Sequence, residues 1–208
     1  NSRAAALYER RGFTPTVLVL TRFGRPTESA STEPDPGIEI VGPSELDALE
    51  PLWLELHHHH QRVASQLAPY VDDAPSWTEK RKQLVATAES GRILRLGPAD
   101  APLGMASFAA SDDISLWADT WTTGPRTAEL KAIVVAERAR GQGVGTRLMN
   151  TVDAFLAEDE IADQWVAAFV GNDDAIDVEE PVEATSEPEE MAAVVSVGAL
   201  ERQQESRR

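Results

Sequence analysis

The sequence lacks cysteine altogether, so neither a disulfide framework nor a thiol nucleophile is available. It has no apolar run that approaches the roughly 18 residues of a membrane-spanning helix, and no secretory signal is visible. These absences favour an intracellular, cytoplasmic protein that does not enter a membrane. The length of 208 residues suits one domain with appendages.

Positive charge is scarce, with 19 Lys and Arg against 35 Asp and Glu and a net charge of −16. Half of the excess lies in residues 171–208, where eleven acidic residues accompany three arginines. Nucleic-acid-binding surfaces need clustered Lys and Arg, so the composition argues against nucleic acid as a partner. A solvated acidic tail explains the excess without assigning it a specific role.

The most informative segment is a six-residue run at 140–145, Arg-Gly-Gln-Gly-Val-Gly. It follows the apolar stretch 130–135 and precedes the amphipathic stretch 146–156, an order that predicts a strand, a tight turn and a helix. The glycines leave backbone N–H groups unobstructed, and the helix directs the positive end of its dipole at the same place. Such a turn suits a phosphate or pyrophosphate. Neither a Walker loop nor the dinucleotide fingerprint is present.

Residues 129–149, ELKAIVVAERARGQGVGTRLM, contain the motif R/Q-x-x-G-x-G/A. This stretch resembles the acyl-CoA-binding segment of the GCN5-related N-acetyltransferase (GNAT) family, and the resemblance covers roughly residues 38–178. It implies an α/β (α+β) fold of the GNAT type, in which helices flank both faces of a central mixed β-sheet. The patterns along the chain predict the family's order of elements: strands at 38–41, 92–96, 103–110, 129–135 and 164–170, with helices at 44–67, 77–89 and 143–157, of which Ser44 and Ser76 cap the first two.

Residues 1–23, NSRAAALYERRGFTPTVLVLTRF, resemble the segment that closes the family's fold, with a helix at 1–12 and a strand at 14–23. At the usual place for this segment, after residue 170, Glu179 stands where the family has Tyr, and Pro181 breaks the helix. The sequence therefore divides into 1–23, a C-terminal-like helix and strand; 24–37, a flexible linker; 38–178, the acetyl-CoA-binding core; and 179–208, an acidic tail expected to be poorly ordered.

Three alternatives explain the displaced segment. Residues 1–23 complete the domain's own sheet, as in a circular permutation, or they insert into a neighbouring molecule, which would give a homodimer. The third alternative is the stump of an upstream acetyltransferase in a tandem protein, an origin that the initial Asn in place of Met favours. The linker of 14 residues reaches up to about 46 Å, whereas crossing the sheet needs about 25–30 Å, so the first alternative is geometrically possible.

The resemblance implies acetyl-CoA as co-substrate and no metal. Strand residues would pair their backbone with the pantetheine arm, and the glycine-rich turn would hold the pyrophosphate through backbone N–H groups. Asn172, the asparagine after the strand at 164–170, would lie near the cofactor, and Asn1 competes for this role. The alternative is that Asn172 is a helix cap. The cofactor residues so implied are Ile133, Val134, Val135, Arg140, Gly141, Gln142, Gly143, Val144, Gly145, Thr146 and Asn172.

Acyl transfer to an amine needs a base for the ammonium and a proton for the departing thiolate. Glu129 is the candidate general base, acting through a water, since a carboxylate with apolar neighbours can have a raised pKa. Tyr8 is the candidate general acid, provided that residues 1–23 occupy the closing position. The alternatives are that Glu129 is a solvated charge at the end of a strand and that Tyr8 is a structural aromatic.

Four consecutive histidines, 57–60, lie within a predicted helix. Because helical neighbours point about 100° apart, they cannot all bind one metal ion. They either line the amine-acceptor cleft or are simply exposed. Candidate neighbours in that cleft are Asp72, Asp73, Trp77 and Trp121.

The sequence thus predicts an N-acetyltransferase that moves an acetyl group from acetyl-CoA to a small-molecule or peptide primary amine, by direct attack in a ternary complex. One alternative is a catalytically degenerate acyl-CoA-binding or regulatory domain, which the degraded residues after 170 support. The other is a fragment of a tandem protein with no function of its own.

Overall fold

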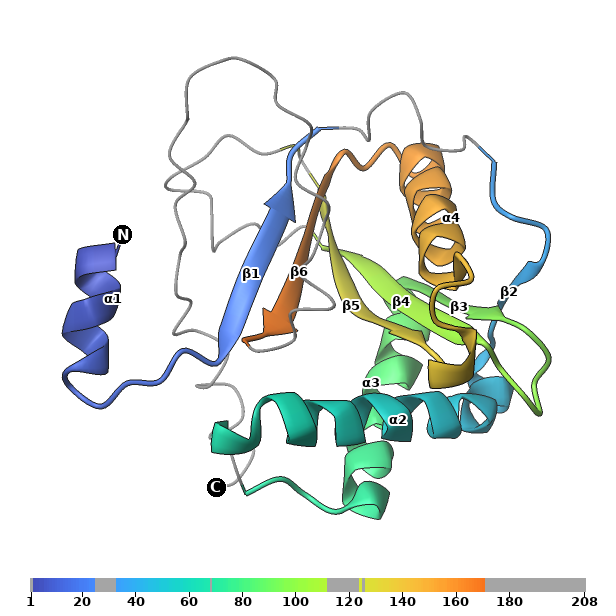
Figure 1. Ribbon diagram of the computed structural model, residues 1–208. Coiled ribbons are helices and arrows are strands. Elements are labelled where there is room, and N and C mark those ends of the chain that lie inside the picture. The colour runs from blue at the N-terminus through green and yellow to red at the C-terminus, as the bar shows by residue number, and fades with distance from the viewer. Residues whose placement is uncertain (1, 25–32, 68, 112–123, 125, 171–208) are drawn as a thin grey trace.

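A six-stranded mixed β-sheet organises the protein in the computed structural model, which describes residues 2–24, 33–67, 69–111, 124 and 126–170 (Figure 1). The strands are β1 (Val17–Arg22), β2 (Ile38–Ile40), β3 (Gly91–Leu96), β4 (Gly104–Ser111), β5 (Thr127–Val135) and β6 (Asp163–Phe169). Their spatial order is β1-β6-β5-β4-β3-β2. All neighbouring pairs are antiparallel except β5 and β6, which are parallel.

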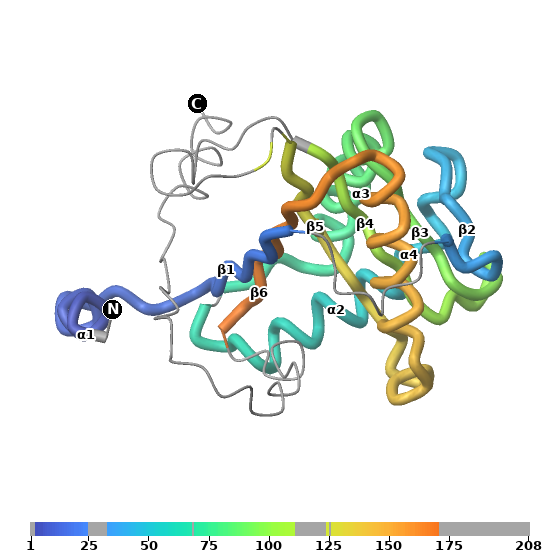
Figure 2. The backbone as a smooth tube through the Cα atoms, turned by 90° about the horizontal axis from the view of Figure 1, so that it is seen from above, coloured from blue at the N-terminus to red at the C-terminus, as the bar shows by residue number. Residues whose placement is uncertain are grey.

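Helices cover both faces of this sheet. They are α1 (Ser2–Glu9), α2 (Glu50–Val63), α3 (Asp73–Ser90) and α4 (Val144–Glu158), with short 3-10 turns η1 (Pro43–Leu49), η2 (Ser65–Leu67) and η3 (Glu137–Ala139). α4 packs on β3, β4 and β5, whereas α3 packs on β3 and β4 from the opposite face (Figures 1 and 2). α2 contacts α3 and β5 and crosses the end of the sheet where β5 and β6 terminate (Figure 1).

The core forms where α4 meets the sheet. Val144, Leu148 and Val152 recur at a spacing of four residues, so one apolar face of α4 is buried. A Cβ atom at Gly104 on β4 would lie 2.8 Å from Cγ1 of Val144, so glycine allows α4 to approach the sheet closely. This packing fixes where α4 begins relative to the end of β5.

Most predicted elements are confirmed, but two helix starts were wrong. The helix predicted from Trp77 begins at Asp73, with Asp72 at the N-cap position. Ser76 therefore lies inside α3, buried, where its Oγ accepts a hydrogen bond of 3.0 Å from Nε1 of Trp53. The chain after Gly42 first forms the 3-10 turn η1, so Ser44 does not cap α2.

The N-terminal strand lies in this chain's own sheet. β1 pairs with β6 from Val17 opposite Phe169 to Arg22 opposite Gln164. The Arg22 guanidinium binds the buried Asp153 carboxylate of α4 through two contacts of 2.5 and 3.1 Å, and the Gly24 N–H donates to Asp163. The strand therefore forms one edge of this chain's own sheet.

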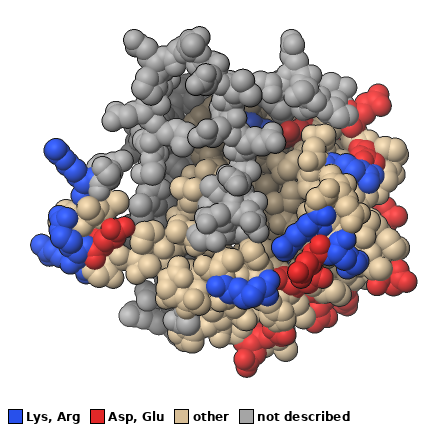
Figure 3. All heavy atoms as spheres, in the orientation of Figure 1, with Lys and Arg blue, Asp and Glu red and all other residues tan. Residues whose placement is uncertain are grey.

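α1 behaves differently from the strand that follows it. Figures 1 and 2 show α1 standing apart from the sheet, and Leu7, Tyr8 and Phe13 are 47%, 51% and 64% exposed. Figure 3 shows basic side chains gathered on this helix and its C-terminal end, where the sequence has Arg3, Arg10 and Arg11, in an otherwise acidic protein. The closing helix and strand are thus not docked as one unit.

The predicted flexible linker is anchored at its C-terminal part. The backbone N–H of Asp35 donates to Oγ1 of Thr151, and the Asp35 carboxylate accepts from Nε of Arg147 at 2.7 Å. These contacts hold residues 33–37 against α4. Asn1, Trp121, Asn172, Glu179 and Pro181 lie outside the described residues.

Candidate active site

The glycine-rich turn joins η3 to α4. Gly141 and Gly143 have φ angles of 71° and 74°, a left-handed conformation that glycine adopts without strain. Open space surrounds a Cβ atom at either position, so the backbone conformation requires glycine here and packing does not. Gly143 is the N-cap of α4, and the first N–H groups of this helix point out of its end without intrahelical acceptors. The turn is therefore suited to an anion.

β5 and β6 diverge next to this turn. They are paired from Thr127 opposite Asp163 to Leu130 opposite Val166, and no pairing continues beyond Leu130. The other edge of β5 stays bonded to β4 as far as Val135. Residues 131–135 of β5 therefore present backbone groups toward a wedge between the two parallel strands, where an extended ligand with amide groups can pair.

A cleft of about 510 Å³ connects the wedge with the turn. Its walls come from β5, the glycine-rich turn and the start of α4, and α2 contributes two side chains. The lining residues are Leu56, His59, Ile133, Val134, Val135, Ala139, Arg140, Gly141, Gly143, Val144, Gly145 and Thr146. The structure thus brings together nine of the eleven residues expected at the cofactor. Of the other two, Gln142 donates to the Arg138 carbonyl at 2.9 Å, and Asn172 is not described.

Glu129 lies on the paired part of β5, before the strands diverge. Its Oε2 accepts a hydrogen bond of 2.6 Å from Nζ of Lys131, a residue that a β-bulge opposite Ser107 and Phe108 leaves without a partner on β4. The Lys80 ammonium is also close, and it is buried. Burial, and to a smaller extent the charge of Lys131, lower the pKa of Lys80 to about 8, whereas the Glu129 carboxylate acts in the opposite direction. Glu129 therefore belongs to an ionic cluster and lacks the apolar surroundings expected from the sequence.

Tyr8 does not join the cleft in this structure. It lies on α1, apart from the sheet, and its ring contacts Phe13 with centroids 5.7 Å apart. The structure therefore brings neither candidate catalytic residue into the lining of the cleft; Glu129 lies on the same strand, four residues before Ile133.

The four histidines point in different directions, as helix geometry requires. His57 is buried and contacts the Val71 carbonyl at 2.9 Å, and His58 pairs with Asp73 at 2.8 Å. His60 packs on Phe169 of β6, and burial lowers its pKa to about 4. Only His59 of the four lines the cleft. No group of three or more His, Asp or Glu within the described ranges could hold a metal ion.

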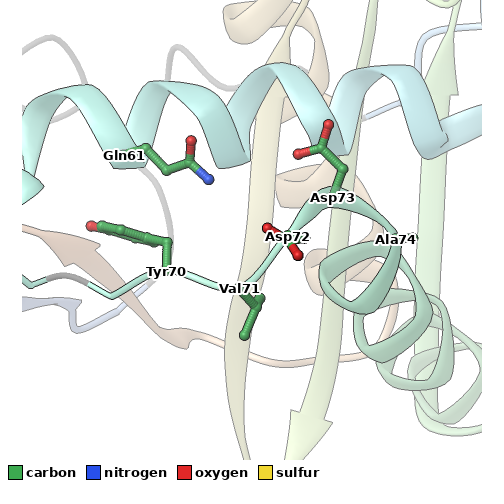
Figure 4. A pocket seen from close by; sticks show the side chains of 6 residues that line it. All are labelled: Gln61, Tyr70, Val71, Asp72, Asp73 and Ala74. Atoms are coloured by element: carbon green, nitrogen blue, oxygen red, sulfur yellow. The ribbon is translucent and has the colours of Figure 1, made fainter.

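A second cavity lies between the C-terminal half of α2 and the start of α3 (Figure 4). Its volume is about 670 Å³, and it is lined by Gln61, Tyr70, Val71, Asp72, Asp73 and Ala74. Asp72 and Asp73 line this cavity, whereas Trp77 belongs to the buried core, so the structure does not bring these candidates together with the glycine-rich turn. In the part of the chain that the structure describes, no helix is both long and apolar enough to cross a membrane.

The sequence missed Leu56 and Lys80, and it offered His59 only as one of four histidines that could line a cleft. Leu56 and His59 are three residues apart on a helix, so they share a face, but nothing local to the sequence shows that this face meets β5. The burial of Lys80 follows from the packing of α3 against the sheet, which a local pattern does not determine.

Two features together define the acetyltransferase class of fold. One is a mixed sheet with two diverging parallel strands, and the other is a glycine-rich turn that starts a helix at their open end. Residues 52–179, more than half of the chain, match the sequence model described as the Acetyltransferase (GNAT) family. The chain belongs to this family. Comparison with curated proteins finds no match.

Solved structures agree on the fold. A mutant of the BH1408 protein from Bacillus halodurans has a TM-score of 0.56 at 12% identity, covering 73% of this chain and 98% of its own. A GCN5-related N-acetyltransferase from Ralstonia eutropha JMP134 has a TM-score of 0.51 at 18% identity, covering 73% and 96%. At these identities the likeness shows the fold alone, and it confirms the α+β arrangement predicted from the sequence.

Proposed function

We propose that the protein transfers an acetyl group from acetyl-CoA to a primary amine by direct attack in a ternary complex. One observation carries this proposal: the anion-binding turn at the start of α4 opens into the wedge where β5 leaves β6. Family membership supports the same conclusion. The acceptor is a small-molecule or peptide amine.

Acetyl-CoA fits this cleft by its chemistry. The pyrophosphate takes the N–H groups of residues 141–146, where the α4 dipole favours negative charge, and Arg140 adds a positive charge at the same end of the cleft. The pantetheine arm carries amides that pair with the open edge of β5 at 133–135. The thioester then lies just past Ile133 within the wedge, and Glu129 lies further in along β5.

Catalysis by this arrangement is direct. The chain has no cysteine for an acyl-enzyme intermediate, so the amine attacks the thioester carbonyl itself. Glu129 accepts the amine proton through a water, and Lys131 keeps the carboxylate in place by its hydrogen bond. The open backbone of β5 provides N–H groups for the developing oxyanion.

Calorimetric titration with acetyl-CoA tests the cofactor site, with Gly143→Glu as the diagnostic variant. We expect one-to-one binding by the wild type, and a loss of roughly a hundredfold or more, about 2.7 kcal/mol, in the variant. The added carboxylate places negative charge where the pyrophosphate must lie. Unchanged affinity in the variant would remove the turn from the site.

Gly12→Glu is the matched control for this substitution. Gly12 also has a positive φ, 86°, and open space around its Cβ position, but it lies beside α1. Both variants therefore carry the same added charge and the same kind of backbone strain. We expect Gly12→Glu to bind acetyl-CoA like the wild type.

A second candidate function is an acyl-CoA-binding domain without catalysis. The distance of α1 from the sheet, which leaves Tyr8 outside the cleft, favours it. Turnover separates the two functions. Released coenzyme A can be followed with a thiol reagent, since the protein contributes no thiol of its own. Binding without release above the uncatalysed rate, across a panel of primary amines, would support the second candidate.

A further inference from the structure

We propose that His59 is a catalytic residue that gives its proton to the thiolate of coenzyme A as the thioester breaks. This inference rests on the proposed function. It begins from the position of α2, which crosses the open end of the wedge between β5 and β6 (Figure 1). A histidine at this position can reach a ligand that lies between the two strands.

Two neighbouring histidines locate this part of α2. His60 packs on Phe169 at the end of β6, with ring centroids 4.5 Å apart. His59 lines the cleft together with Ile133, Val134 and Val135 of β5. The imidazole of His59 therefore borders the same cleft as the open edge of β5, where the arm of coenzyme A lies in the proposed function.

α2 is held firmly enough to position this side chain. The Glu55 carboxylate accepts a hydrogen bond of 2.9 Å from the Glu137 N–H, at the start of the 3-10 turn that leads into the glycine-rich loop. Leu52 is buried in the core, and His57 contacts the Val71 carbonyl. A side chain on a helix anchored at several points keeps its orientation better than one on a loop.

The reaction needs a proton donor in this position. When the amine nitrogen bonds to the carbonyl carbon and the C–S bond breaks, the electron pair stays on sulfur as a thiolate. Glu129 takes the proton from nitrogen, His59 gives a proton to sulfur, and water restores the proton of His59. Imidazole suits the step because its charge changes near neutral pH. Tyr8, the other possible donor, lies on a helix apart from the sheet.

The test compares His59→Gln with His58→Gln. His58 lies on the same helix but pairs with Asp73 outside the cleft, so it is a matched control. Turnover is followed as coenzyme A thiol released from acetyl-CoA with a panel of primary amines, or with water as acceptor if no amine serves. We expect kcat to fall roughly a hundredfold in His59→Gln, with the Kd for acetyl-CoA changed by no more than about twofold. His58→Gln should match the wild type.

The pH dependence of kcat gives the second readout. Turnover by the wild type should fall as the pH rises and the donor loses its proton, and His59→Gln should lack this fall. The charged and titratable groups near His59 are Arg140, which lines the same cleft, and Glu55 and His60 on α2. The limb should persist in His58→Gln.

Three results would overturn the inference. In the first, His59→Gln keeps the kcat of the wild type and the fall of kcat at high pH. In the second, His59→Gln loses acetyl-CoA affinity in proportion to its activity, which makes His59 a lining residue only. In the third, Tyr8→Phe abolishes the fall of kcat at high pH and His59→Gln does not. Failure of the proposed function looks different, because the wild type itself would then bind no acetyl-CoA in the calorimeter.

Discussion

At the scale of single residues, Lys80 carries a positive charge into the protein interior. It is 5% exposed, its Nζ lies 4.7 Å from the centre of the Trp53 ring, and its pKa is about 8, mainly because of burial. An unfolded lysine titrates near 10.5. Between these values the unfolded chain binds more protons than the folded one, so the free energy of unfolding rises with pH, by up to about 3 kcal/mol.

Lys80→Met should abolish this rise. Urea unfolding should give the wild type a larger increase in the free energy of unfolding between about pH 7.5 and about pH 10 than it gives the variant. Only the wild type gains stability as Lys80 becomes neutral. Lys82→Met is the control, since Lys82 is an exposed partner of Glu79. If the free energy of unfolding depends on pH equally in the wild type and in Lys80→Met, the charge of the buried amine does not destabilise the folded protein.

Residue-level reasoning from the sequence worked best where chemistry is local. The requirement for glycine at 141 and 143 is a backbone property, and the structure gives both positions a positive φ. The surroundings of Glu129 could not be predicted in the same way. They depend on a bulge that exposes Lys131 and on α3, whose Lys80 arrives from about 50 positions away in the sequence.

At the scale of elements, an ion pair links β1 to α4. Asp153 on α4 is 7% exposed, and Arg22 of β1 binds both of its oxygens and also Oε1 of Gln164. Arg22→Ala should lower the free energy of unfolding by about 2 kcal/mol, because the substitution leaves the buried Asp153 carboxylate unpaired. The loss is smaller than for a fully buried pair because Arg22 is partly exposed.

Arg81→Ala provides the comparison for urea unfolding. Arg81 binds Asp47 in an exposed pair, whose loss should cost less than about 1 kcal/mol. If Arg22→Ala costs no more than Arg81→Ala, β1 is held by strand pairing alone. The sequence predicted β1 as a strand but left its partner open, because β6 lies more than 130 positions further along the chain and local patterns do not specify distant pairing.

At the scale of the whole molecule, the pairing of β1 with β6 decides how many chains one folded unit contains. In the structure described here both strands belong to one chain, whereas a domain swap would make the same contacts between two chains. The two arrangements differ in their response to dilution. Folding within one chain gives a melting temperature that does not depend on protein concentration, whereas a swapped dimer becomes less stable as it is diluted.

We expect a constant melting temperature over about a hundredfold range of concentration, and a mass of one chain by light scattering. The exposed side chains of α1 sharpen this test. Leu7, Tyr8 and Phe13 present apolar surface to solvent in the single chain, and a dimer that buried them would become less stable when Leu7→Ser and Phe13→Ser are combined. A melting temperature that rises with concentration in the wild type, and loses this rise in the double variant, would show that α1 closes a neighbouring molecule. If the melting temperature does not depend on concentration, β1 is the part of residues 1–23 that this chain uses, within its own sheet.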